Sequence, residues 1–302
     1  MKSTLLLLFI SFNSYGQLLI NEFSARGGYE DENGNNCDWV EIINVDSTEI
    51  NLSDYFISDD INDLQKWRLP DEIISSMELM LICLSGDNIR ERVRIWGSIV
   101  DSSSEWKYFE GYNEPDEDWK EIFFNDSSWN SGYAGFGFND YDDTTIITGV
   151  TSFYLRKEFT INDDSIVKLL LHADYDDAFI AYINGFEIAR SKNIYGEDPA
   201  YNHLSSSEHE ALGYRSLPLE IYTFDYQMID TLLHQGKNIL SIQVHDVDSI
   251  SNDMSANFFL HAGLNSDTNS LEPPMSWLVS GSTYYHSNFK LSYGEDLIIS
   301  DV

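Results

Sequence analysis

Basic residues are scarce in this 302-residue chain. Its 17 lysines and arginines stand against 51 aspartates and glutamates, which gives a net charge of −34. A surface of that sign repels phosphate backbones and anionic lipids, so nucleic acid is excluded as a partner. We interpret the charge as a solvated acidic surface, with the gathering of divalent cations as the alternative.

Cysteine is limited to Cys37 and Cys83, and no CxxC pair or Cys/His cluster indicates zinc. Outside the cytoplasm the two cysteines can form a disulfide. Cys83 falls in an apolar predicted strand, however, and Cys37 in a predicted polar loop. The sequence therefore leaves their pairing open.

Catalytic motifs are also missing: HExxH, GxSxG, GxxxxGK[ST] and GxGxxG do not occur. The seven histidines are scattered along the chain. Among 51 acidic residues, a pair of carboxylates spaced as in a glycosidase carries no information. We expect no catalytic residue in this sequence.

The first residues are typical of a secretory signal. Lys2 is followed by the apolar run Leu5–Phe12 and by small residues ending at Gly16. We interpret residues 1–16 as a signal peptide cleaved before Gln17, with a buried first strand as the alternative. No later segment is apolar enough to span a membrane. We expect a secreted or cell-surface protein.

Short alternating runs separated by turn residues recur along the chain and predict an all-β fold. The clearest turn is Asn184-Gly185, where both residues tolerate the positive φ of a type I′ hairpin. The runs are 18–23, 39–44, 55–58, 78–84, 152–159, 167–172, 179–183, 186–189, 238–244 and 256–262.

The spacing of these runs divides the chain into blocks. We expect a first domain over residues 17–100, a linker at 101–104 and a second domain over 105–266. Residues 267–302 form a linker and a partial β element, ending in a hairpin that lacks its partners. Because an isolated hairpin is marginal in water, we expect the natural chain to continue.

The first block resembles the bacterial lamin tail domain, an immunoglobulin-like β-sandwich. The resemblance rests on Leu19-Ile-Asn-Glu-Phe23, Asp38-Trp-Val-Glu-Ile-Ile-Asn44, Lys66-Trp67 and Leu79-Met-Leu-Ile-Cys-Leu-Ser-Gly86. It implies a binding or adhesive module rather than an enzyme.

One loop of the first block has oxygen donors at alternate positions, Asp31, Asn33 and Asn35, with Gly34 between them. This pattern is similar to the first half of a calcium loop. The residue twelve along from Asp31 is Ile42, where such a loop has a bidentate Glu. A polar hairpin loop is therefore the favoured interpretation, with calcium as the alternative.

The second block resembles a galactose-binding-like jelly-roll β-sandwich. The matching residues include Phe124-Asn-Asp-Ser-Ser-Trp129, Tyr154-Leu-Arg-Lys-Glu-Phe159, Tyr182-Ile-Asn-Gly-Phe-Glu-Ile-Ala-Arg190 and Gly236-Lys-Asn-Ile-Leu240. Such sandwiches bind sugars at one rim, with an aromatic ring stacked on the sugar.

The resemblance makes Trp106, Trp119, Arg156 and Arg190 the candidate ligand-binding residues. Core packing is the favoured role for the two tryptophans, and for Trp129 as well. In so acidic a chain, pairing with carboxylates is the favoured role for the two arginines.

Two clusters of carboxylates are candidate calcium sites, because crowded carboxylates need a cation, a proton or open water. Exposed acidic loops are the alternative. The clusters are Asp140, Asp142 and Asp143, and Asp174, Asp176 and Asp177.

Two functions remain open. The first is a secreted, non-catalytic binding or adhesion protein whose partner is a glycan or another cell-surface component. The second is the accessory part of a larger exported enzyme, either a CotH-type atypical kinase or a carbohydrate-active enzyme, whose catalytic domain lies beyond residue 302. The order of the modules is similar to proteins with a downstream CotH-type kinase domain. The sequence does not define an oligomeric state.

Overall fold

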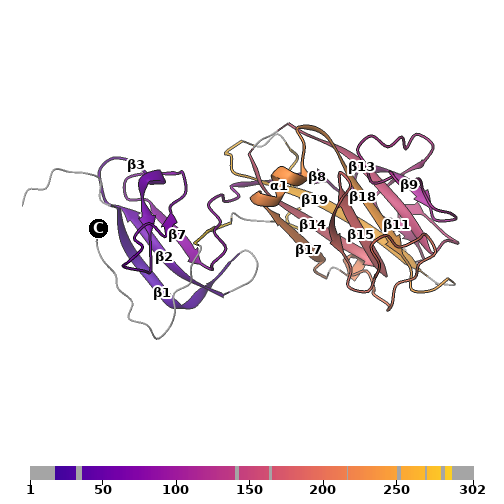
Figure 1. Ribbon diagram of the computed structural model, residues 1–302, viewed down its shortest axis with the longest axis horizontal. Coiled ribbons are helices and arrows are strands. Elements are labelled where there is room, and N and C mark those ends of the chain that lie inside the picture. Colours follow the sequence, from indigo (N-terminus) through magenta and orange to yellow (C-terminus); the bar gives the residue numbers. More distant parts are fainter. Residues whose placement is uncertain are drawn as a thin grey trace, which may run out of the picture. The chain divides into compact units, whose positions relative to one another are not determined.

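The computed structural model describes residues 18–31, 36–139, 143–162, 165–215, 217–249, 253–268, 271–279 and 283–287. Within these ranges the chain is all-β, as predicted, with a single seven-residue α-helix, α1 (Tyr226–Leu232) (Figure 1). No helix of the described residues has the length and apolar character needed to cross a bilayer.

The chain forms two compact units. Unit 1 combines Met1–Arg92 with Thr283–Val302, and unit 2 is Val93–Ser282. Unit 2 therefore interrupts unit 1 in the sequence. Figure 1 labels many of the strands of each unit.

Unit 1 is built on a four-stranded sheet in the order β1-β2-β7-β20, in which only β20 runs parallel to its neighbour. Two short two-stranded sheets, β3-β6 and β4-β5, and the 3-10 turn η1 supply the opposing residues of the core. The bounds are β1 (Leu18–Glu30), β2 (Asn36–Asn44), β3 (Ile50–Asn51), η1 (Leu52–Asp54), β4 (Phe56–Ile57), β5 (Trp67–Arg68), β6 (Ile73–Ile74), β7 (Leu79–Leu84) and β20 (Tyr285–His286).

The core of unit 1 follows from alternation along β2. Val40 and Ile42 are buried on one face of this strand and pack in a cluster with Trp67, which is fully buried. Cys37 lies in β2, not in a loop, and forms a disulfide with Cys83 of β7. The structure thus resolves the pairing that the sequence leaves open.

Residues 283–287 belong to unit 1, although the sequence pattern places them in a separate terminal piece. Tyr285 is buried in the core of unit 1, and β20 pairs with β7. Ile89 and His286 exchange two backbone hydrogen bonds of 2.7 and 2.8 Å. The hairpin predicted within residues 288–302 lies outside the described residues.

Unit 2 is a sandwich of two sheets. One has the order β10-β9-β13-β18-β15-β16, and the other has the order β12-β11-β19-β14-β17, with β8 also paired to β19. The bounds are β8 (Ile95–Val100), β9 (Glu105–Glu110), β10 (Asn130–Tyr133), β11 (Phe136–Phe138), β12 (Thr145–Ile146), β13 (Ser152–Ile161), β14 (Ile166–Asp176), β15 (Ala178–Ile183), β16 (Phe186–Arg190), β17 (Glu220–Asp225), β18 (Gly236–His245) and β19 (Met254–Leu264).

The main core of unit 2 lies between the two sheets. Phe153 and Leu155 of β13 face Leu171 of β14 and Leu260 of β19 in one cluster. The central strands are buried on both faces, so they are almost continuously buried rather than alternating. The predicted hairpin at Asn184-Gly185 is present, and both residues have positive φ, 52° and 86°.

The boundary between the units lies before residue 93, not at residue 100. Strand β8, which the sequence pattern assigns to the first domain, pairs with β19 of unit 2. Residues 101–104, interpreted above as a linker, form a turn between β8 and β9 within unit 2. The Asp101 carboxylate accepts hydrogen bonds from the backbone N–H and the hydroxyl of Ser103.

Candidate functional site

Both candidate tryptophans of unit 2 are buried. Trp106 is 2% exposed in the core between the sheets, and Trp119 is 5% exposed in a second cluster on the other face of the first sheet. In that second cluster Trp119 stacks on Trp129 and meets Tyr154 edge-on. Neither candidate ring offers its face to a sugar at the surface.

Arg156 holds the segment that carries this second aromatic cluster. Its guanidinium is 2% exposed, pairs with the Asp126 carboxylate at 3.0 Å, and donates to the carbonyls of Trp119 and Glu121. The pairing with a carboxylate is the role that the sequence favours. Arg156 therefore fixes the course of residues 119–126 over the sheet.

Arg190 lies at the surface, at the end of the edge strand β16. It forms a bidentate ion pair with Glu187, with distances of 2.6 and 2.7 Å, and donates to the carbonyl of Gly196. These contacts raise the pKa of the guanidinium, chiefly through the hydrogen bond to Glu187. Arg190 thus joins β16 to the loop that follows it.

Three segments meet around this edge of unit 2. Lys120 lies 2.7 Å from Asp198, which joins residues 118–124 to the loop after β16. The carboxylate of Glu121 packs against Gly185 so closely that a Cβ there would lie 2.4 Å from it. Through Lys120 and Glu121, residues 118–124 therefore contact both the loop after β16 and the hairpin turn at Gly185.

Each of these three segments exposes one aromatic side chain. Phe123 is 94% exposed, Tyr195 is 63% exposed and Phe186 is 53% exposed. We call these three residues the aromatic rim. The same three segments carry two ion pairs, Lys120 with Asp198 and Arg190 with Glu187.

Two members of the second acidic cluster bind backbone amides. The Asp174 carboxylate accepts from the N–H groups of Leu212 and Gly213. The Asp177 carboxylate accepts from His209 and Val247, both at 2.7 Å. These two buried carboxylates therefore fasten the loops after β16 and β18 to the sheet.

The third member, Asp176, has a different environment. Burial, followed by the charges of Asp177 and Asp253, raises the pKa of its carboxyl to about 8. The Asp176 carboxyl therefore keeps its proton at neutral pH. No group of three or more metal-binding side chains forms among the residues that the structure describes.

We expect Asp176→Asn to stabilise unit 2 at pH 9. The folded chain keeps a proton on Asp176 that the unfolded chain loses above about pH 4, so stability falls as the pH rises from about 4 to about 8. The asparagine side chain does not titrate, so the variant avoids this loss of stability. At pH 9 it should raise the free energy of unfolding by about 2 kcal/mol relative to the parent chain. Urea titrations between pH 4 and 9 measure it.

Asp177→Asn is the contrasting variant, because it weakens an acceptor of two buried amides. It should destabilise unit 2 by about 2 kcal/mol across the same pH range. A calcium-dependent rise in Tm that Asp176→Asn abolishes would show a bound cation in place of the proton on Asp176.

The remaining acidic candidates are placed only in part. Asn33, Asn35, Asp140 and Asp142 lie outside the described residues. Asp143 lies beside Gly137 of β11. Asp31 is buried and lines a polar pocket of about 490 Å³ in unit 1, together with six further residues: Asn36, Cys37, Asp38, Leu84, Ser85 and Asp87.

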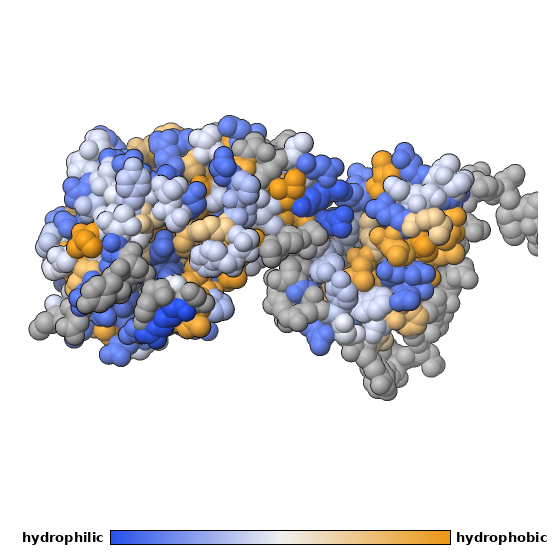
Figure 2. Space-filling model, turned by 180° about the vertical axis from the view of Figure 1, so that it is seen from behind, coloured by the Kyte–Doolittle hydropathy of each residue, from blue (hydrophilic) through white to orange (hydrophobic). Residues whose placement is uncertain are grey.

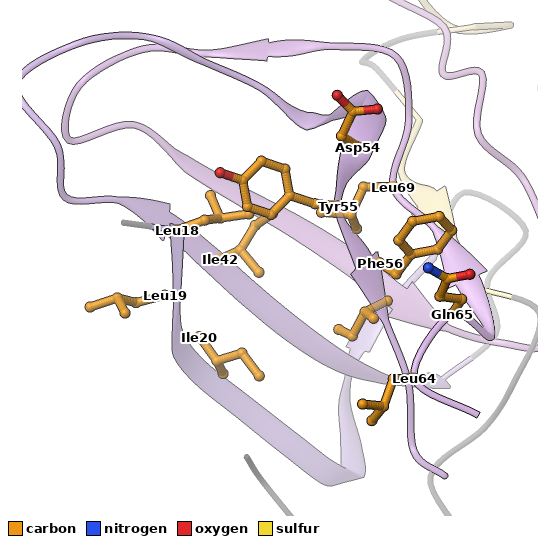
Figure 3. A pocket seen from close by; sticks show the side chains of 11 residues that line it. Leu18, Leu19, Ile20, Ile42, Asp54, Tyr55, Phe56, Leu64, Gln65 and Leu69 are labelled. Carbon is orange, nitrogen blue, oxygen red and sulfur yellow. The ribbon is translucent and has the colours of Figure 1, made fainter. Parts of the chain in front are cut away.

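Unit 1 also has an apolar groove of about 450 Å³ (Figure 3). Hydrophobic atoms reach the surface of this unit at several places, seen in orange on the right of Figure 2. In the close-up, β1 forms one wall of the groove, and the segments around β4 and before β5 form the other. Its lining residues are Leu18, Leu19, Ile20, Ile42, Asp54, Tyr55, Phe56, Ile57, Leu64, Gln65 and Leu69.

Sequence reasoning missed both the aromatic rim and the groove. Ile122, Phe123 and Phe124 are equally apolar, and only the fold turns Phe123 outward while Phe124 packs on Trp129. The Asn-Gly hairpin turn next to Phe186 is the one signal in the sequence that marks this edge.

No protein-family model matches the sequence, and no curated protein matches it. Among solved structures, this chain is similar to β-glucuronidase from Bacteroides uniformis, with 16% identity, a TM-score of 0.35, and coverage of 55% of this chain and 18% of the enzyme. A β-glucuronidase from an uncultured Clostridium has 12% identity, a TM-score of 0.35, and coverage of 58% and 29%. The chain thus spans less than a third of these enzymes, and similarity at this level assigns no function.

Proposed function

We propose that this chain is an exported binding protein without catalytic residues of its own. Unit 1 is a module of the lamin-tail type, and unit 2 is a galactose-binding-like module that holds a glycan. The aromatic rim of unit 2 carries this proposal. Its exposed aromatic rings lie on three segments that also carry charged hydrogen-bonding groups, at one edge of the sandwich.

The rim suits a sugar better than a flat protein partner. Sugars present apolar C–H faces that stack on aromatic rings, and hydroxyl groups that need donors and acceptors. Lys120 and Arg190 supply donors, while Glu187 and Asp198 supply acceptors. Because Arg190 and Lys120 are already paired, they are held in position before a ligand arrives.

The net charge of the whole chain limits the class of sugar that we expect unit 2 to bind. A net charge of −34 repels sulfated glycans and uronic acids, so neutral or amino sugars are the favoured class. We therefore expect binding to galactose- or hexosamine-containing oligosaccharides, and weaker binding in low salt for acidic ones.

Phe123→Ala should weaken glycan binding about tenfold, equivalent to the loss of about 1.4 kcal/mol. Its ring is almost wholly exposed, so the substitution removes a contact surface and no core packing. A glycan array selects the oligosaccharide, and calorimetry measures its Kd with the parent chain and the variant.

Tyr133→Ala is the matched control, since Tyr133 is 55% exposed on β10, at the opposite edge of the same sheet. Its Kd should equal that of the parent chain. Equal losses in the two variants, or no binding to any neutral or amino glycan, would refute the rim as a sugar site.

A further inference from the structure

Two buried histidines of unit 2, which the aromatic rim does not involve, lie next to each other on the second sheet. His172 of β14 lies between Leu171 and Ala173, which face the core, and His261 of β19 likewise lies between two core residues. Side chains alternate along a strand, so both imidazoles are on the outer face of the sheet. β14 and β19 are neighbours, and the two ring centroids are 5.2 Å apart.

Residues 271–279 cross this outer face, and we call this segment the strap. At its start, the N–H of Ser98 in β8 donates to the Glu272 carbonyl at 2.7 Å. Near its end, the Leu278 carbonyl lies 3.2 Å from Nε2 of His172 in β14. β19 lies between β8 and β14 in the sheet (Figure 1). The strap therefore passes from one side of β19 to the other.

His261 lies between the two ends of the strap. Its cross-strand partner on one side is Ser98, which the start of the strap contacts. On the other side, His172 is the partner of Phe259, and Trp277 of the strap meets the Phe259 ring edge-on with centroids 6.3 Å apart. Consistent with a segment crossing at this position, His261 is 1% exposed.

Three of the four ring nitrogens of this pair are buried without a hydrogen-bond partner among the described residues. They are both nitrogens of His261 and Nδ1 of His172. Protonation makes both nitrogens of an imidazole donors and adds a positive charge. A buried charge without a partner is costly. The position beneath the strap therefore suits the neutral form of both rings.

The charged groups on the surrounding elements do not compensate a charge on the pair. They are Asp101 after β8, Lys168, Asp174 and Asp176 on β14, Asp225 on β17, and Glu272 in the strap. Lys168 pairs with Asp225 at 3.8 Å, and the Asp174 carboxylate accepts from backbone amides. Asp176 keeps its proton at neutral pH, and Glu272 is exposed. Asp101 raises the pKa of His261 by less than burial lowers it.

We propose that the strap is acid-sensitive, and that protonation of His172 and His261 releases residues 271–279 from the outer face of the second sheet. Release breaks the contact between His172 and the Leu278 carbonyl and gives both imidazoles access to water. It also uncovers Phe259, which is 3% exposed while the strap is bound. Acid therefore changes one face of unit 2 while the sandwich itself stays folded.

The direction of the pH effect follows from burial. Burial lowers the pKa of His172, and burial, followed by the charge of His172, lowers the pKa of His261 from 6.5 to about 4. Once the strap is released, both rings meet water and their pKa values return toward 6.5. The bound strap thus has its full stability above about pH 6.5 and loses it as the pH falls toward 4. For His261 alone, the ratio of released to bound strap should rise at least about fiftyfold between about pH 7.5 and 4.5.

Hydrogen exchange measured by NMR on the full chain tests the proposal through the Ser98 amide, whose acceptor lies in the strap. Its protection factor, which corrects for the intrinsic exchange rate at each pH, should fall at least about tenfold from about pH 7.5 to 4.5. The fall should be absent in His172→Gln/His261→Gln and smaller in His261→Phe. His234→Gln, which changes a histidine in the turn before β18, is the matched control and should behave like the parent chain.

The amides of β13, in the first sheet, report whether unit 2 stays folded. They also report on His245 of β18, whose pKa burial lowers to about 4. A Ser98 protection factor that does not change with pH would overturn the proposal, as would a fall of the same size in the histidine variants. An equal fall in β13 would also overturn it, because acid would then unfold the whole unit. If the double variant does not fold, His261→Phe, which keeps a ring at that position, decides the question.

Discussion

Replacing Arg156 with methionine is expected to lower the free energy of unfolding of unit 2 by roughly 3 kcal/mol. The guanidinium is 2% exposed and serves one carboxylate and two backbone carbonyls, which all lose their donor together. Methionine fills much of the same volume, so the loss reports the polar contacts more than a cavity. Urea unfolding, followed by tryptophan fluorescence, measures it.

Arg190→Met is the matched control on the surface of the same unit. Its ion pair with Glu187 is 27% and 37% exposed, so its removal should cost less than about 1 kcal/mol. The sequence makes both arginines candidate ligand-binding residues. The comparison of the two variants distinguishes a buried arginine that positions a segment from a surface arginine in an exposed ion pair. Similar losses for both variants would contradict a positioning role for Arg156.

Removing the disulfide with Cys37→Ser/Cys83→Ser should destabilise unit 1 by about 4 kcal/mol. The bond closes a loop with a sequence separation of 46, and its release returns that loop entropy to the unfolded chain. Because unit 1 has a small core, a loss of this size should leave it largely unfolded at about 37 °C.

Unit 2 contains neither cysteine and serves as the internal control for this experiment. Its amides should keep their exchange protection in the double variant, while those of β2 and β7 lose it. An unchanged midpoint for unit 1 in denaturant would mean that the disulfide adds nothing to its stability. A parallel loss in unit 2 would mean that the two units do not unfold separately.

Many individual strands were predictable from the local sequence. Runs such as 39–44, 179–183 and 256–262 correspond to β2, β15 and β19, and the Asn184-Gly185 turn has the expected backbone. Alternation and turn chemistry are local properties, so they can be read without knowing the partner strand.

The division into units was not predictable in the same way. Strand β8 follows β7 closely in the sequence but pairs with β19, and β20 returns to β7. Such partners are chosen by the packing of distant residues, which no local pattern records. The boundary at residue 100 and the separate terminal piece are wrong for this reason.

The sequence predicted the ion pairs of the candidate site but not which aromatic residues are exposed there. The sequence correctly favours ion pairs for both arginines, and the structure shows them with Asp126 and Glu187. It makes Trp106 and Trp119 candidates for sugar stacking but favours core packing for both, and both are buried. Exposure depends on which face a loop turns outward, and for Phe123 only the fold shows it.

The interruption of unit 1 by unit 2 sets an order of completion during synthesis. When β7 has left the ribosome, its neighbour β20 does not yet exist, and all of Val93–Ser282 must be made first. At usual translation rates that delay is about 10 to 40 seconds. Unit 2, which is continuous, is synthesised without interruption in that interval. Unit 1, whose strands β1 to β7 are made first, is therefore the last to be completed. Until β20 is made, its four-stranded sheet lacks one strand.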